Sequence, residues 1–201
     1  MSKKSKRSIS YLGIGLCFAY LLIVIIFIAT GSGIFLTLME ILTMASALFF
    51  LLFLQTVLVD AHKERSILKH GALIAISGCI MLTIITHFVN LTITRPIMAQ
   101  GVDVPLYFQI GQWPSVEMAL DYLSWGLFLG IALICTALTI PKNNIMKITL
   151  LSCGFLCLVG FIGPIIGIVD MWYIAVMGYT VGAVVLCIIQ IINNKERERN
   201  E

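Results

Sequence analysis

Six long, unbroken runs of apolar residues constrain the fold of this chain more than any other feature of its sequence. A helix needs about 20 apolar residues to cross about 30 Å of hydrocarbon, and each run is long enough to do so. The runs are continuous, without the alternation of barrel strands, so helices are the only spanning structure to consider. We expect six transmembrane helices, at Ser10–Thr30, Ile34–Val59, Gly71–Ile93, Val116–Ile140, Met146–Val169 and Met171–Ile192.

The composition of the chain agrees with this expectation. Of its 201 residues, 60% are hydrophobic and 11% are charged, whereas a typical soluble domain is about 45–50% apolar and about 25% charged. A soluble domain of this size has too little interior to bury so many apolar side chains. The expected fold class is therefore all-α: a polytopic integral membrane protein whose residues 1–201 form a single domain, a bundle of six transmembrane helices.

The basic residues predict the orientation in the membrane. Segments 1–9, 60–70, 141–147 and 193–201 would lie on one side, and they hold 12 of the 13 Lys and Arg residues; only Arg95 falls on the other side. Short loops rich in Lys and Arg stay in the cytoplasm, so we expect both termini to be cytoplasmic. Topology and anionic lipid headgroups explain the basic face, and nucleic acid is not expected as a partner.

The six cysteines give no sign of disulfide bonds. All of them fall within the predicted spans, and none lies in an outer loop, where disulfides would form. Cys153 and Cys157 are four residues apart and would share a helix face, as a pair of soft metal ligands does. No His, Cys or acid near them in sequence completes a ligand set. We expect reduced, unpaired cysteines, and the sequence identifies no metal or cofactor.

Two further features concern the shape of the bundle. The outer loop 94–115 is long for so compact a protein and carries Leu106–Ile110 and Trp113, so it either lies at the membrane interface or covers the bundle as a lid. In the fifth span, Pro164 predicts a kink. Glycines there and in the sixth span predict either close helix packing or a gate.

A layer of polar residues in the outer half of the bundle is the candidate site. Counted at 1.5 Å per residue, Glu40 and His87 lie about 10 Å from the outer ends of their spans, and Asp121 lies about one turn into its span. An ionisable group at mid-helix costs about 2.5–3.5 kcal/mol to insert, so such groups are normally paired or in contact with water. We expect these three residues to converge, and the other candidates for the same layer are Asn90, Arg95 and Asp170.

The sequence leaves two functions open. The polar layer fits a protein that binds or transports a small cationic or amphiphilic ligand from the outer face. Alternatively, the layer only holds the helices together in a non-catalytic structural protein or partner subunit. The chain has no His-Glu-x-x-His, Gly-x-Ser-x-Gly or Gly-rich phosphate motif, which argues against an enzyme. The expected partners are the lipid bilayer, a small-molecule ligand, and another copy of the chain or a partner membrane subunit.

Overall fold

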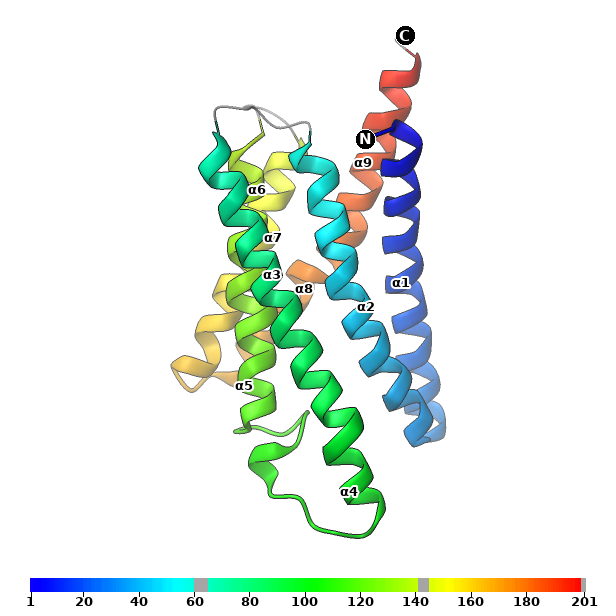
Figure 1. The fold of residues 1–201 in the computed structure, drawn as a ribbon, viewed down its shortest axis with the longest axis vertical. Coiled ribbons are helices and arrows are strands. Elements are labelled where there is room, and N and C mark those ends of the chain that lie inside the picture. The colour runs from blue at the N-terminus through cyan, green and yellow to red at the C-terminus, as the bar shows by residue number, and fades with distance from the viewer. Residues whose placement is uncertain (60–64, 141–144, 200–201) are drawn as a thin grey trace.

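A computed structural model describes residues 1–59, 65–140 and 145–199 of the chain. Its elements are helical throughout, and six of them are long and apolar enough to cross a membrane, which confirms the predicted fold class. Both termini lie at the same end of the bundle (Figure 1), as an even number of crossings requires. We call this the terminal end and the opposite one the loop end. Parts of the two predicted cytoplasmic connections, residues 60–64 of segment 60–70 and residues 141–144 of segment 141–147, lie outside the described residues.

The first two spans are single helices, α1 (Lys3–Thr30) and α2 (Gly33–Leu58). The third span consists of α3 (Ser66–Val89), the π-helical η2 (Asn90–Thr94) and α4 (Arg95–Ala99). The fourth span consists of α5 (Val116–Tyr122), the π-helical η4 (Leu123–Phe128) and α6 (Leu129–Leu138). The fifth span is α7 (Ile145–Ile165). The sixth contains the 3-10 turn η5 (Val169–Met171), α8 (Trp172–Tyr179) and α9 (Val181–Arg199). The 3-10 turn η3 (Leu106–Phe108) lies in the long loop.

The spans form a closed ring in which each packs against its neighbours in sequence, and α1 packs against α9 to close the circle. Gly13 makes this closure possible, because a methyl group in its place would lie 2.9 Å from the sulfur of Cys187. α1 has the fewest buried residues of the six spans. It is therefore the wall of the bundle with the largest face left for lipid.

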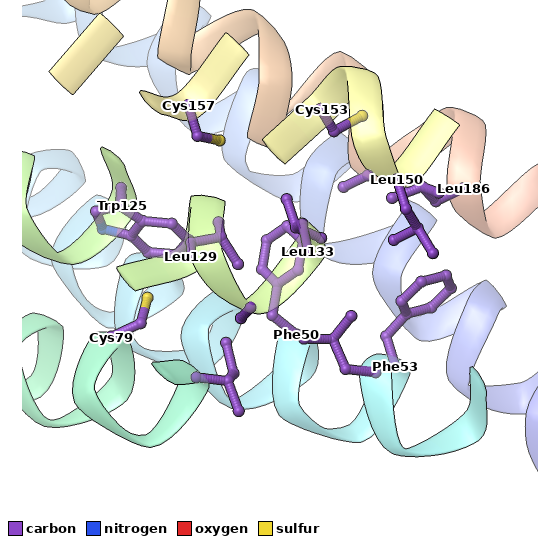
Figure 2. Packing of buried hydrophobic residues seen from close by; sticks show 14 of the residues in the cluster. Phe50, Phe53, Cys79, Trp125, Leu129, Leu133, Leu150, Cys153, Cys157 and Leu186 are labelled. Atoms are coloured by element: carbon purple, nitrogen blue, oxygen red, sulfur yellow. The ribbon is translucent and has the colours of Figure 1, made fainter. Parts of the chain in front are cut away.

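The core of the ring is built from side chains of α2, α3, α6, α7, α8 and α9. Figure 2 shows Leu129 and Leu133 between Phe50 on one side and the cysteines of α7 on the other. Both leucines are fully buried. In contrast, many large apolar side chains of the spans point outward and are exposed. An apolar outer surface of this kind is what a bilayer covers.

Close packing explains the glycines of the fifth span. A methyl group at Gly160 would lie 2.5 Å from Cβ of Ala175 and 2.6 Å from its backbone nitrogen. The α7 and α8 backbones are therefore in direct contact at this point, as small residues in membrane helices allow. The structure supports the packing interpretation of Gly160.

The kink predicted at Pro164 is wrong. Pro164 lies in the last turn of α7, which ends at Ile165. Gly167 follows with φ +81°, and its N–H donates to the carbonyl of Pro164, while the N–H of Ile168 donates to Gly163 over 2.8 Å. This pattern is a Schellman motif, which ends a helix by satisfying its last carbonyls. The proline therefore helps to end the span and does not bend it.

The third span is longer than predicted, because its helix continues past Ile93 to Ala99. Pro96 cannot donate a backbone hydrogen bond, and its ring disfavours the preceding α-helical turn. The chain widens into η2 just before this residue, and the N–H of Arg95 donates to the carbonyl of Asn90, five residues back. The wide turn thus allows the helix to continue, and it keeps Arg95 helical instead of placing it in a loop.

All six cysteines are free, in agreement with the prediction. Cys79, Cys153, Cys157 and Cys187 are buried, and Cys17 and Cys135 are partly buried.

Candidate functional site

Glu40, in α2, is the centre of a buried polar cluster that we define as Glu40, His87, Asn90, Arg95 and Asp121. Three side chains from the third span donate to its carboxylate. Nδ1 of His87 bonds to Oε2, while Asn90 Nδ2 and Arg95 Nη2 bond to Oε1 over 2.7 and 3.0 Å. Arg95 also donates to the hydroxyl of Thr37. The carboxylate is buried and well satisfied, so it ties the second span to the third.

His87 connects this carboxylate to a second one. Its Nε2 lies 3.4 Å from Oδ1 of Asp121, in α5, and neither atom has a hydrogen-bond partner among the described residues. The imidazole is buried, and the Asp121 side chain is 16% exposed. The imidazole thus lies between two carboxylates from different spans. Both oxygens of Glu40 accept hydrogen bonds, whereas Oδ1 of Asp121 accepts none from the described residues.

Local structure explains how the acids of the fourth span reach this place. The hydroxyl of Ser115 accepts a hydrogen bond from the N–H of Met118 and so caps the start of α5. Glu117 and Asp121 then lie four residues apart on one helix face. Glu117 is buried, and its Oε1 accepts a hydrogen bond of 3.1 Å from Thr94 in η2.

A cavity of about 640 Å³ lies beside the polar cluster, and both His87 and Asp121 line it. This volume is within the range of about 300–1,000 Å³ that is typical of small-molecule sites. Residues of α1, α2, η4, α8 and α9 form the other walls, among them Tyr20, Thr43, Phe50, Trp125, Trp172, Tyr173, Tyr179 and Val184. The cavity therefore has one polar corner and predominantly aromatic and aliphatic walls.

The aromatic walls continue as a chain of ring contacts towards the loop end. Trp125 contacts Phe50 and Tyr179, Tyr179 contacts Trp172, and Trp172 contacts Tyr122, with centroids 4.3–6.0 Å apart. Trp113 of the long loop packs on Tyr122 at 5.3 Å. In contrast, Leu106, Tyr107 and Phe108 of the same loop are exposed. The loop therefore has one aromatic residue anchored next to the cavity wall and an apolar segment free to contact the membrane interface.

The structure brings five of the six candidates together and leaves Asp170 apart. Asp170 is exposed in η5, and its side chain makes no hydrogen bond or ion pair with another described residue. Its neighbour Tyr173 does line the cavity. The sequence analysis did not select Glu117, because an acid in the first turn of a helix already has a structural explanation. The four-residue spacing from Asp121 was the available signal.

A metal site has no support in the described part of the chain. There, no group of three or more His, Cys, Asp or Glu side chains is arranged to hold an ion. The imidazole of His87 lies between the two carboxylates, so the three side chains do not converge on one point.

Comparisons of the chain with protein-family models, curated proteins and solved structures found no match. The function is therefore inferred from the chemistry of the cavity and the polar cluster.

Proposed function

We propose that this multi-pass membrane protein, with both termini in the cytoplasm, binds a small amphiphilic cation in the cavity from the outer side. The observation that carries the proposal is the carboxylate of Asp121, which lines an aromatic cavity and has an oxygen without a hydrogen-bond partner among the described residues. Under this proposal the loop end faces outward, because 12 of the 13 basic residues belong to the segments at the terminal end.

The chemistry of the walls favours an organic cation over a neutral ligand. The faces of Trp and Tyr rings attract cations, and a desolvated contact of this kind is worth up to about 2 kcal/mol. Tyr20, Trp125, Trp172 and Tyr179 supply such rings, and Asp121 supplies the counter-charge. An apolar part of the ligand would fill the remaining space against Phe50 and the aliphatic residues.

The exposure of the lining residues favours entry from the membrane. Leu21 of α1, Tyr173 of α8 and Val181 of α9 line the cavity and are 56%, 69% and 49% exposed. Because they belong to apolar spans, we infer that the cavity opens between α1 and the sixth span, on a face that lipid would cover. An amphiphile already dissolved in the outer leaflet would reach this mouth directly.

A purely structural protein or partner subunit is the alternative, and one observation favours it for part of the cluster. Glu40 has three donors and needs no ligand to satisfy it. We therefore assign the holding of the helices to Glu40 and the binding of the ligand to Asp121. The two roles predict different consequences when each acid is replaced.

The proposed function is tested by measuring binding of tetraphenylphosphonium, a permanent lipophilic cation, to the protein in phosphatidylcholine nanodiscs. Empty nanodiscs give the background from lipid. Asp121→Asn keeps the shape of the side chain and removes its charge, so the affinity is expected to fall at least about tenfold, the equivalent of about 1.4 kcal/mol. Triphenylphosphine oxide, a neutral compound of related shape, is expected to bind equally to both proteins.

The matched control is Asp103→Asn, which removes an exposed acid of the long loop. It has the same effect on net charge and is expected to leave the affinity unchanged. An equal loss of affinity in Asp103→Asn and Asp121→Asn would show that general surface charge, and not the carboxylate of Asp121, attracts the cation. Binding of the cation to empty nanodiscs alone would overturn the proposed function.

A further inference from the structure

We propose that the cation which binds at Asp121 displaces a proton from His87, so that the site exchanges one organic cation for one proton. This inference rests on the proposed function, because it specifies the chemistry of the same site. It predicts that ligand binding and proton release are linked, which simple binding to a fixed carboxylate does not require.

The first argument is the geometry of the imidazole. Nδ1 of His87 is hydrogen-bonded to Glu40, and Nε2 faces Oδ1 of Asp121 at 3.4 Å. A neutral imidazole has one N–H and one lone pair, so with both acids ionised its lone pair would point at a carboxylate oxygen. An imidazolium presents a donor to each acid instead. The arrangement is therefore complete only when the imidazole carries its second proton.

The second argument is the charge of the surroundings. His87 pairs with Glu40 from α2 and Asp121 from α5, Glu117 from α5 interacts with it electrostatically, and Arg95 from α4 is the base paired with Glu40. With all three acids ionised, these groups carry a charge of −2 when the imidazole is neutral and −1 when it is protonated. The other titratable groups of the cavity wall are Cys17, Tyr20, Tyr173 and Tyr179.

The proton on Nε2 and the ligand compete because both are placed beside the carboxylate of Asp121. A monovalent cation at Asp121 supplies the positive charge that the imidazolium otherwise provides, and both together would crowd two cations beside one carboxylate in a medium of low dielectric. Exchange of one for the other leaves the total charge of these groups, with Glu117 included, at −1. The N–H bond at Nε2 breaks, and because His87 lines the cavity, the proton passes to water that enters the cavity. The bond from Nδ1 to Glu40 is kept.

The primary experiment measures proton release. Tetraphenylphosphonium is added to the protein in phosphatidylcholine nanodiscs, in weak buffer containing a pH indicator, at several pH values between 6 and 9. We expect release to approach one proton per bound cation. By linkage, the affinity is then expected to rise about tenfold per pH unit where the site titrates, because protons compete with the cation.

The chain offers a way to assign that proton, because it contains only three histidines. The variant with His62→Gln and His70→Gln keeps His87 as its single histidine. Imidazole nitrogen NMR is expected to show doubly protonated His87 without the cation and singly protonated His87 with it. This variant leaves the polar cluster intact, so its interpretation does not depend on whether a replacement of the buried His87 folds.

The outcomes separate the two proposals. Binding without proton release at every pH, or an imidazole signal unchanged by the cation, would overturn the exchange and leave the proposed function standing. Full proton release that persists in a folded His87→Gln variant would assign the proton to another group and likewise overturn the exchange. Failure of the cation to bind above the background of empty nanodiscs would overturn both.

Discussion

Nδ1 of His87 is hydrogen-bonded to the carboxylate of Glu40, although the two residues belong to different transmembrane helices, α3 and α2. The contact is buried, and Asn90 and Arg95 bond to the same carboxylate. Glu40, at one end of the imidazole, is thus fully hydrogen-bonded within the protein, whereas Asp121, at the other end, lines a cavity. This difference gives the first prediction.

Replacement of Glu40 is expected to destabilise the protein far more than replacement of Asp121. Glu40→Ala leaves His87, Asn90 and Arg95 without their shared acceptor, and loss of one partner of a buried ion pair costs about 3–5 kcal/mol. Asp121→Ala removes only the contact at 3.4 Å. Thermal unfolding of both variants in the same detergent checks this. Equal losses would contradict the division of roles between the two acids.

A methyl group at Gly160 is expected to separate α7 from α8. The added carbon would collide with the backbone of Ala175, and overpacking of a tight contact costs about 1–3 kcal/mol. Gly15→Ala in α1 is the matched control, because no atom lies within 4 Å of the added methyl there. The unfolding temperature of Gly160→Ala is expected to fall and that of Gly15→Ala to be maintained or raised. The reverse order would refute the close contact.

The depth of the polar cluster could be predicted from the sequence, because residues counted from the end of a span give a distance along the membrane normal. This placed Glu40, His87 and Asp121 in one layer. The direction in which a side chain points around its helix depends on packing, and counting does not provide it. The structure places the exposed Asp170 outside the cluster, and it buries Glu117 on the helix face of Asp121, although an acid in the first turn of a helix already had a structural explanation.

Cys17 is expected to report on occupation of the cavity. It lines the cavity and is partly buried, whereas Cys157 is fully buried in the core. A small membrane-permeable alkylating reagent is expected to modify Cys17 well before Cys157, and tetraphenylphosphonium is expected to slow the modification of Cys17. Peptide mass spectrometry measures both rates. Modification of Cys17 at the same rate with and without the cation would argue that the ligand does not enter this cavity.

Tyr20 is expected to contribute to cation affinity through its ring face. Tyr20→Leu keeps an apolar side chain at the cavity wall and removes the aromatic ring, so the affinity for tetraphenylphosphonium is expected to fall about two- to fivefold, in line with about 0.5–1 kcal/mol for such a contact. Tyr11→Leu, at an exposed position of the same helix, is expected to have no effect. Equal affinities of the two variants would exclude Tyr20 from the binding surface.

The orientation in the membrane is tested by reporter fusions. Fusions after Lys69, Lys147 and Glu201 are expected to report the cytoplasm, and a fusion near Asp103 the opposite side, because the basic residues belong almost entirely to the terminal-end segments. Any fusion that reports the wrong side would contradict the proposed topology.

Hydropathy predicted all six spans, yet the third span continues beyond its predicted end, past Pro96, and the kink predicted at Pro164 is wrong. A proline has a strong local effect, but whether the helix widens, ends or bends there depends on the hydrogen bonds around it. At Pro96 a wide turn accommodates the missing backbone N–H, and at Pro164 the helix ends one residue later. Neither outcome follows from the residue type alone.

The wide turn before Pro96 also determines the direction, around the helix axis, in which the following side chains of this span point. Five residues of regular α-helix rotate by about 500°, which would leave Arg95 about 140° away from Asn90 around the axis. In η2 the two residues are instead joined by a five-residue hydrogen bond, and both side chains reach the same oxygen of Glu40. Removal of a single residue between them would shorten this wide turn to a regular four-residue turn, in which the arginine would lie about 40° from Asn90 around the axis. The wide turn therefore brings the fifth residue after Asn90 back to the helix face that the fourth would have in a regular helix, and this position lets Arg95 share the carboxylate.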